Sequence, residues 1–353
     1  MLTFHPLELV RRRPIAEDAV CLELRPPPGL ETAYRFEAGQ HLAVRAMIGG
    51  RELRRTYSIV SQTGGPLKIG VRVQGEMSRF LASELPVGGR LESLEPTGRF
   101  RPALEPGGNK RYVALAAGSG ITPVLSIAAT LLAAEPQSRM LVAYGNRSIS
   151  RSMFVDELLG LKNRYLGRLS VVFVMSREPQ DVELFNGRLD AARLRELARS
   201  EFDPRTIDEF FVCGPGSMVK ELTATLKELG ATGKIHAERF AVDTQSAPAA
   251  APKAGAGAAA AGAEISITMD GRRRSFRMAP DRTILDAAEA AGLSLPYSCR
   301  AGVCSTCRAR VTAGTAVMER NQALEDWEVQ AGFILCCQAR PTSGRLDISY
   351  DEK

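Results

Sequence analysis

The chain has 353 residues, of which 44% are hydrophobic and 24% charged, and its formal net charge is +6. This length predicts two or three domains, each large enough to bury a core. The basic residues are scattered through the chain, with no run longer than three, which argues against a nucleic-acid partner. Three widely spaced histidines (His5, His41 and His236) leave little scope for a His-rich metal site or a His-centred catalytic triad.

The amino terminus carries Glu8 and no apolar stretch of signal-peptide length, so we expect no secretory signal. One uncharged segment, residues 113–134, is long enough to resemble a membrane span. It contains Gly118, Gly120 and Pro123, which fit a buried strand, a turn and a helix better than a span. We therefore expect a cytoplasmic protein with no membrane partner.

Residues 1–105 show short alternating runs bounded by turns, with Gly49-Gly50 as a hairpin turn. This pattern predicts an antiparallel β-barrel domain. From Arg111 onward, apolar strand-like runs alternate with helical segments. That alternation predicts a doubly wound parallel sheet over residues 106–243.

Residues 244–263 form the sharpest change in composition, because 16 of these 20 residues are Ala, Gly or Pro. An alanine-rich helix is the rival interpretation, but Pro248, Pro252 and Gly255 interrupt it. We expect a flexible linker with a typical reach of about 25 Å. Residues 264–353 then predict a small α+β domain that opens with a hairpin at Asp270-Gly271, continues with a helix over residues 282–291 and carries a cysteine loop.

Five of the seven cysteines lie in the last 55 residues. Cys299, Cys304 and Cys307 are spaced C-x4-C-x2-C, and Cys337 follows after 29 intervening residues, which matches the plant-type 2Fe-2S spacing. Structural zinc is the alternative, although zinc sites usually combine two C-x2-C pairs. Because neighbours on a strand point to opposite faces, only one of Cys336 and Cys337 can be a ligand. Cys21 and Cys213 fit buried structural positions.

Two segments of the first domain suit a flavin dinucleotide. Arg55, Tyr57 and Ser58 would offer a cation for the pyrophosphate, an aromatic face for the ring system and a hydroxyl near its redox-active nitrogen. Gly75-Glu76-Met77-Ser78 precedes a helical segment, where free N–H groups at a helix start can hold phosphate.

Two further segments suit a nicotinamide dinucleotide. Gly118, Gly120, Thr122 and Pro123 lie between an apolar strand and a helix, which favours a pyrophosphate at the helix start. Arg147, Ser148 and Arg151 follow the next strand and could accept a 2′-phosphate, which favours NADPH over NADH. Solvated loop arginines remain the alternative interpretation.

The motifs together resemble known families. The segments SCRAGVCSTCRARVTAG and GFILCCQARPTS resemble a plant-type ferredoxin, and Gln338, which follows the last ligand in that family, identifies Cys337 as the fourth ligand. R-x-Y-S, G-x-x-S and G-x-G-x-x-P resemble the ferredoxin–NADP reductase superfamily. This resemblance implies that the first two motifs bind FAD. It also implies that Cys213, Gly214, Pro215 and Met218 border the nicotinamide and that Phe240 covers the second flavin face.

The order of domains resembles the reductase components of multicomponent oxygenases, and segments such as SREPQDVELFNGRLD resemble those of the bacterial phenylacetyl-CoA epoxidase complexes. A nicotinamide delivers two electrons as hydride and a 2Fe-2S cluster takes one, so a flavin is needed between them. We predict the path NADPH to FAD to cluster to an oxygenase partner, with Ser58 and Cys213 at the hydride-transfer site. Several alternatives remain open. The chain could be the reductase of a ketosteroid hydroxylase, a Rieske oxygenase or a hybrid-cluster protein, a diaphorase without a dedicated partner, or a redox sensor or zinc-stabilised binding module.

Overall fold

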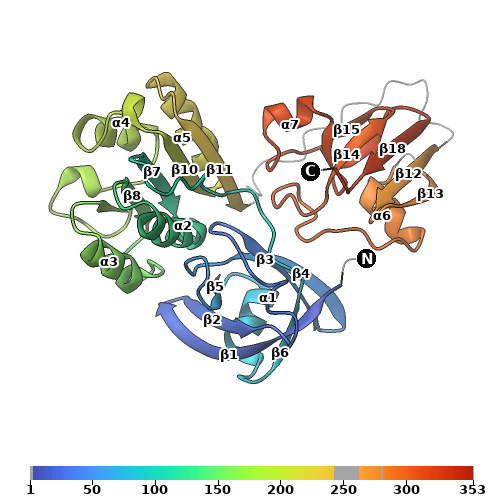
Figure 1. Ribbon diagram of the computed structural model, residues 1–353, viewed down its shortest axis with the longest axis horizontal. Coiled ribbons are helices and arrows are strands. Elements are labelled where there is room, and N and C mark those ends of the chain that lie inside the picture. The colour runs from blue at the N-terminus through green and yellow to red at the C-terminus, as the bar shows by residue number, and fades with distance from the viewer. Residues whose placement is uncertain (1–2, 242–261, 280, 353) are drawn as a thin grey trace. The chain divides into compact units, whose positions relative to one another are not determined.

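The computed structural model describes residues 3–241, 262–279 and 281–352 (Figure 1). The chain divides into two compact units, of which the first is Phe4–Ala241 and the second contains the C-terminal part of the chain. Most of the predicted linker lies outside the described residues, and of its positions only Gly262 and Ala263 are described. Within the described residues, no helix combines the length and the apolarity needed to cross a membrane.

A six-stranded antiparallel sheet forms the first part of the Phe4–Ala241 unit, in the order β4-β3-β6-β1-β2-β5. An isolated bridge pairs Ile59, just beyond β4, with Ile69 of β5, so the two edge strands meet and the sheet is barrel-like. The predicted antiparallel barrel-like fold is therefore confirmed. The strands are β1 His5–Ala16, β2 Ala19–Arg25, β3 His41–Ile48, β4 Arg51–Ser58, β5 Leu67–Arg72 and β6 Arg90–Ser93.

Alternation of side chains explains the interior of this sheet. Leu7 and Leu9 of β1, together with Leu22 and Leu24 of β2, are buried in one apolar cluster. The predicted hairpin at Gly49-Gly50 joins β3 to β4, and both glycines have positive φ, as a tight two-residue turn requires. Between β5 and β6 lies one short helical stretch, α1 Glu76–Arg79 followed directly by the π-helical turn Phe80–Glu84.

The second part of this unit is a five-stranded parallel sheet in the order β11-β10-β7-β8-β9. From β7 the chain adds β8 and β9 on one side and then returns to add β10 and β11 on the other side. The strand order therefore reverses at β7, as the predicted doubly wound fold requires. The strands are β7 Arg111–Ala117, β8 Arg139–Asn146, β9 Leu169–Met175, β10 Glu209–Pro215 and β11 Lys234–Ala241.

Helices cover both faces of the parallel sheet (Figure 1). Ala114 and Ala116 of β7 pack with α2 on one face, whereas Val113 and Leu115 pack with α4 and α5 on the other. Burial on both faces explains why β7 is apolar without interruption. The helices are α2 Ile121–Ala134, α3 Val155–Arg164, α4 Ala191–Ser200 and α5 Gly216–Glu228, with 3-10 turns at Gly118–Gly120, Glu183–Phe185 and Pro204–Thr206.

The C-terminal unit has a five-stranded mixed sheet in the order β13-β12-β18-β14-β16, in which β12 and β18 are parallel, and a separate pair β15-β17. The predicted hairpin at Asp270-Gly271 joins β12 to β13. The predicted helix corresponds to α6, which is capped by the Thr283 side chain. The elements are β12 Ala263–Met269, β13 Arg272–Met278, α6 Ile284–Ala290, β14 Arg308–Ala313, β15 Ala316–Met318, α7 Asp326–Gln330, β16 Phe333–Leu335, β17 Ala339–Pro341 and β18 Arg345–Ser349.

Candidate functional site

Two of the predicted motifs meet where the parallel sheet changes direction. The turn Gly118–Gly120 follows β7, and Cys213 stands near the end of the adjacent strand β10. A Cβ at Gly120 would lie only 2.2 Å from the carbonyl oxygen of Cys213. Only glycine therefore permits this approach, which brings the predicted pyrophosphate turn against the predicted nicotinamide segment. In doubly wound sheets, this crevice at the carboxyl ends of the strands is the usual ligand site.

The first turn of α2 and the start of α5 lie at the carboxyl ends of β7 and β10. Thr122 and Pro123 are buried, and the Thr122 hydroxyl donates to the Ser119 carbonyl oxygen at 2.8 Å. Pro215 precedes the first residue of α5, and Met218 is half-buried. A Cβ at Gly214 would lie 2.7 Å from the terminal methyl of Met218, so Gly214 leaves room for that side chain.

The Cys213 side chain is fully buried. Its thiol lies 3.9 Å from a carboxylate oxygen of Glu238 on β11. Burial raises the pKa of Cys213 well above its ordinary value, and burial likewise raises the pKa of Glu238 to about 8. Burial thus favours the neutral form of both groups. Two residues further along β11, the half-buried Phe240 packs against the apolar cluster that includes Cys213.

Tyr144 links the nucleotide turn to the loop that follows β8. Its hydroxyl donates to the Gly118 carbonyl oxygen at 3.0 Å and accepts the Met153 N–H at 3.0 Å. Burial raises the pKa of this phenol to about 12, so it remains a donor at neutral pH. Tyr144 therefore holds two separate backbone segments in a fixed relation.

The three residues predicted to hold a 2′-phosphate lie in different surroundings. Arg147 is exposed, and the Ser148 hydroxyl lies 3.1 Å from that of Ser150. Arg151 is instead ion-paired with Asp18, in the turn between β1 and β2. Arg147 is thus available to a ligand, whereas Arg151 already has an anionic partner.

The predicted flavin residues of β4 do not share one face. Arg55 and Tyr57 are two residues apart and lie on one side of the strand, whereas Ser58 lies on the other and is 5% exposed. Burial raises the pKa of Tyr57, so its phenol stays neutral. The Arg55 guanidinium, which is exposed, donates to the Arg54 carbonyl oxygen at 2.7 Å.

The segment from Gly75 to Ser78 forms a tight helix start. The Ser78 hydroxyl accepts the N–H groups of Gln74 and Gly75 at 2.8 and 2.9 Å and donates to the Gly75 carbonyl oxygen at 2.9 Å. A hydroxyl with two accepted bonds and one donated bond has no capacity left. Ser78 therefore shapes the turn. Met77 is 2% exposed and packs in the barrel-like core, so only its backbone could reach a phosphate.

The cysteine loop of the C-terminal unit is shaped by its backbone. Arg300, Gly302 and Ser305 have φ values of 53°, 76° and 55°, in the left-handed region. A Cβ at Gly302 would lie 3.0 Å from both the Arg320 carbonyl oxygen and the Gln338 side chain. Turns of this kind point successive N–H groups toward one concavity, as iron–sulfur sites require. The Ala301 N–H donates to the Cys299 sulfur at 3.3 Å, and the Thr306 hydroxyl donates to the Cys304 sulfur at 3.2 Å.

The four predicted ligand thiols lie close enough to share hydrogen bonds. Contacts with Cys304 and Cys337 hold the pKa of Cys299 far below its usual range. Contacts with Cys299 raise the pKa of Cys304, and contacts with Cys299 and Cys307 raise that of Cys337. Four crowded thiols cannot all ionise without a compensating charge, and iron supplies such a charge.

The donor set fits a binuclear cluster. A 2Fe-2S cluster asks for four protein sulfurs, two at each of two irons. The four cysteines, the small residues between them and the N–H and hydroxyl donors to sulfur meet that requirement.

The remaining cysteines are buried and free. Cys336 is fully buried in the core of the C-terminal unit, and burial raises the pKa of its thiol. Burial also raises the pKa of Cys21 to about 11. The Gln338 amide, by contrast, reaches the Cys337 sulfur at 3.8 Å and donates to the Arg300 carbonyl oxygen at 2.9 Å. Gln338 therefore ties the distant fourth cysteine to the loop that carries the other three.

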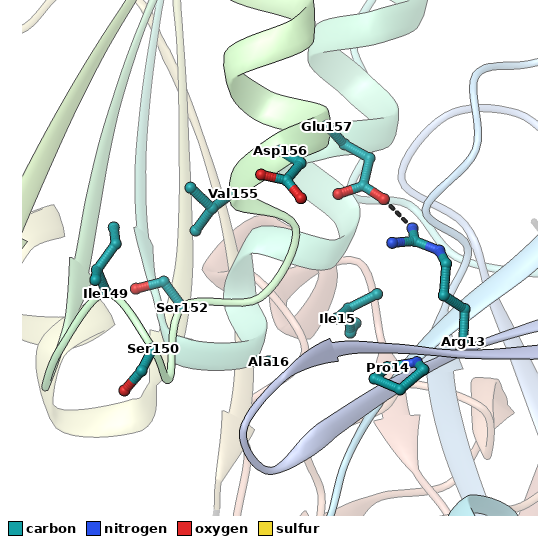
Figure 2. A pocket seen from close by; sticks show the side chains of 10 residues that line it. All are labelled: Arg13, Pro14, Ile15, Ala16, Ile149, Ser150, Ser152, Val155, Asp156 and Glu157. Atoms are coloured by element: carbon teal, nitrogen blue, oxygen red, sulfur yellow. Dashed lines mark hydrogen bonds and ion pairs between the residues drawn. The ribbon is translucent and has the colours of Figure 1, made fainter.

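A cavity of about 380 Å³ lies between the β1–β2 hairpin and the start of α3, beside the loop that carries Arg151 (Figure 2). Figure 2 shows Arg13 of β1 paired with Glu157 of α3 across it. Ser150 and Ser152 line the same cavity from the loop after β8. None of its lining residues is a predicted cofactor residue, so the cavity marks the junction of the two sheets.

The sequence interpretation missed the residues that join these motifs. Asp18, Arg72 and Tyr144 each connect two segments that are distant in the chain. An aspartate in a hairpin turn, an arginine at a strand end and a tyrosine within an apolar strand are common, and nothing in the local pattern signals their connection.

Comparisons with known families agree with this geometry. Residues 6–101 match the family described as oxidoreductase FAD-binding domain, residues 114–223 the oxidoreductase NAD-binding domain, and residues 267–342 the 2Fe-2S iron-sulfur cluster binding domain. The protein is thus an oxidoreductase that uses FAD, a nicotinamide nucleotide and a 2Fe-2S cluster.

The chain is 39% identical to one of the subunits of the 1,2-phenylacetyl-CoA epoxidase of Escherichia coli, over 100% of its own length and 99% of that protein. It is 32% identical to the ferredoxin reductase component of 3-ketosteroid-9-alpha-monooxygenase of Mycobacterium tuberculosis over 90% of its length and 86% of that protein. The chain therefore belongs to the family of oxygenase reductase components that combine these three domains.

Solved structures share the fold. Phthalate dioxygenase reductase superimposes with a TM-score of 0.58 at 24% identity, covering 98% of both chains. An intact type IV self-sufficient cytochrome P450 monooxygenase gives a TM-score of 0.69 at 23% identity. The chain covers 98% of its own length in that comparison but only 41% of the P450's length.

Proposed function

We propose that this reductase takes electrons from NADPH and delivers them to the oxygenase component of a phenylacetyl-CoA epoxidase. The observation that supports electron uptake from NADPH is the close approach of Gly120 to the Cys213 backbone, which brings the predicted pyrophosphate and nicotinamide segments together. The full-length similarity to the Escherichia coli epoxidase protein supports delivery to that oxygenase component. The chemistry that the bound groups supply is hydride acceptance by the flavin and single-electron transfer by the cluster.

The residues of the chain have positioning roles in this proposal. Gly118, Gly120 and the start of α2 hold the nucleotide pyrophosphate, and the exposed Arg147 favours a 2′-phosphate. Arg55 and Tyr57 face the flavin, and the backbone from Gly75 to Ser78 holds its phosphates. Cys213 and Glu238, whose neutral forms burial favours, line the nicotinamide position.

We also propose the predicted domain boundaries of residues 1–105, 106–243 and 264–353, with the linker between the last two. Residues 264–353 hold 12 basic and 12 acidic residues, so the net charge of +6 lies before them. A tether raises the effective concentration of one domain near another, which removes the need for charge steering. Seven cysteines of which none forms a disulfide suit the reducing cytoplasm as the working compartment.

Replacing one cluster ligand tests this function. In Cys304→Ser, we expect NADPH to reduce the flavin within about twofold of the wild-type rate, while electron transfer to cytochrome c falls to background. Cys336→Ser is the matched control, because it removes the neighbouring buried thiol and leaves the four predicted ligands intact. Cytochrome reduction that survives in Cys304→Ser would contradict the path through the cluster.

The proposed partner is tested separately. Purified reductase is combined with the oxygenase subunits of a phenylacetyl-CoA epoxidase, and product formation is compared with that from a ketosteroid hydroxylase oxygenase. Turnover with only the ketosteroid enzyme would favour the reductase of that oxygenase as the alternative function.

A further inference from the structure

Asp18 occupies the turn between β1 and β2, and its carboxylate is shared by two arginines from different sheets. One guanidinium nitrogen of Arg72 at the end of β5 lies 2.8 and 3.0 Å from the two Asp18 oxygens. Arg151 from the loop after β8 pairs with the same carboxylate. The side chains of Arg72 and Asp18 are 9% and 19% exposed, so this pair is better shielded from water than an ordinary surface salt bridge, whereas the Arg151 side chain is 33% exposed.

These pairs belong to a continuous set of hydrogen bonds. Arg72 also donates to the Arg151 carbonyl oxygen at 2.7 Å, and the Asn146 amide donates to that oxygen at 3.2 Å. The same amide donates to the Tyr144 hydroxyl, which in turn reaches Gly118. The hairpin of the barrel-like sheet is thereby linked to the predicted pyrophosphate turn of the parallel sheet.

The loop after β8 is surrounded by charges of both signs. Glu178 accepts the Ile149 N–H at 2.8 Å, and the Ser150 hydroxyl lies 3.4 Å from Glu17. The charged residues of this loop and of the segments beside it are the cations Arg72, Arg147, Arg151 and Arg177 and the anions Glu17, Asp18 and Glu178. Among these anions, Asp18 is the one that forms ion pairs with two of the cations in the described structure, Arg72 and Arg151.

We propose that Asp18 is a specificity-determining residue that competes with the 2′-phosphate of NADPH for Arg151. This inference rests on the proposed function, in which the loop after β8 meets the adenosine ribose. With Arg151 already paired, Arg147 supplies most of the attraction for the 2′-phosphate. Asp18 thus limits the preference for NADPH over NADH while it holds the loop against the barrel-like sheet.

Asp18→Asn isolates the charge, because the side chain keeps nearly the same size and one accepting oxygen. Loss of one negative charge beside Arg151 should tighten binding of a 2′-phosphate about fivefold. Glu17→Gln is the matched control, because it neutralises the adjacent residue of the same turn, for which no arginine partner is seen in the described structure. In Asp18→Asn/Arg151→Gln the gain should disappear, since the arginine released by the first change is absent.

The test uses the FAD-loaded full chain and two probes that differ in the 2′-phosphate, adenosine 2′,5′-bisphosphate and adenosine 5′-monophosphate. Calorimetry should show about fivefold tighter binding of the bisphosphate to Asp18→Asn, with less than about a twofold change for the monophosphate. The ratio of kcat/KM for NADPH and NADH should shift by the same factor. Equal changes for both probes, or a gain that persists without Arg151, would overturn the proposal.

Arg147→Gln and Arg151→Gln in the otherwise wild-type chain provide a second test that does not depend on the Asp18 variant. The bisphosphate should lose more affinity in Arg147→Gln than in Arg151→Gln, and the reverse order would also overturn the proposal. If neither NADPH nor NADH reduces the flavin of the wild-type chain, the proposed function itself is contradicted.

Discussion

The nucleotide turn after β7 and the cysteine loop before β14 both depend on glycine, but for different reasons. At Gly120 the absent Cβ makes room for the backbone of β10, a strand that lies about 90 residues further along the chain. At the cysteine loop, three of the four predicted ligands fall within nine residues, and left-handed Arg300, Gly302 and Ser305 set the curvature. The first site is assembled by the sheet, and the second is mostly assembled by its own loop.

This difference separates the effects of mutations. A change at the nucleotide turn alters how two strands meet and should affect nucleotide binding without loss of the cluster. A change at the cysteine loop alters the local backbone and should affect cluster retention without loss of nucleotide binding.

The largest effect is expected at Gly120. In Gly120→Ala, the new Cβ would meet the Cys213 carbonyl oxygen, so the turn must move, and we expect KM for NADPH to rise about tenfold to a hundredfold. Gly107→Ala is the control, because Gly107 lies outside the predicted motifs and has a φ of 88° but no atom within 4 Å of a Cβ. Only backbone strain of about 1 to 2 kcal/mol is expected there. Steady-state kinetics with an artificial electron acceptor measures KM for NADPH in both variants. Equal KM values in the two variants would contradict the view that the contact of Gly120 with β10 assembles the nucleotide site.

A smaller effect is expected at Gly302. In Gly302→Ala, the methyl group would press on the Arg320 carbonyl oxygen and the Gln338 side chain while φ stays positive, so we expect the cluster to be lost severalfold faster in air. Gly292→Ala shares the positive φ but meets no atom within 4 Å, and it serves as the control. Visible absorption follows cluster loss. Cluster lifetimes that are equal in the two variants would show that crowding at Gly302 is unimportant.

The smallest effect concerns pH at the sheet-built site. Burial raises the pKa of Glu238 to about 8 from an ordinary value of 4.5, so the folded chain binds more protons than the unfolded chain between these values. Stability should therefore fall as pH rises through that window, and Glu238→Gln should flatten the decline. The midpoint of thermal FAD release, followed by flavin fluorescence from about pH 5 to 8, measures this slope. An unchanged slope in the variant would show that Glu238 is hydrated and titrates normally.

The local patterns in the sequence predicted the elements well. The hairpin turns at Gly49-Gly50 and Asp270-Gly271, the alternation of strands and helices after Arg111 and the helix near residue 284 follow from short-range rules, and the structure contains all of them. The cysteine spacing predicted a cluster site because three thiols lie on one loop. The crowding of Cys337 with Cys299 could be expected only from the resemblance.

The contacts between distant segments could not be predicted in the same way. The pairing of Arg151 with Asp18, the saturation of the Ser78 hydroxyl and the burial of Met77 depend on how strands from separate parts of the chain come together. Alternation along β4 places Ser58 on the opposite side of the strand from Arg55 and Tyr57, although the three residues form one sequence motif. Local motifs identified the cofactors, and tertiary contacts determine what each residue of a motif can do.

Rapid mixing of the full chain with NADPH without oxygen tests the central claim most directly. Flavin and cluster absorption are followed together in wild type and Gly120→Ala. The account predicts that the flavin bleaches first and the cluster follows, and that the variant slows the flavin phase at subsaturating NADPH while its cluster content stays normal. A cluster that is reduced before the flavin, or whose reduction is independent of the flavin, would contradict it.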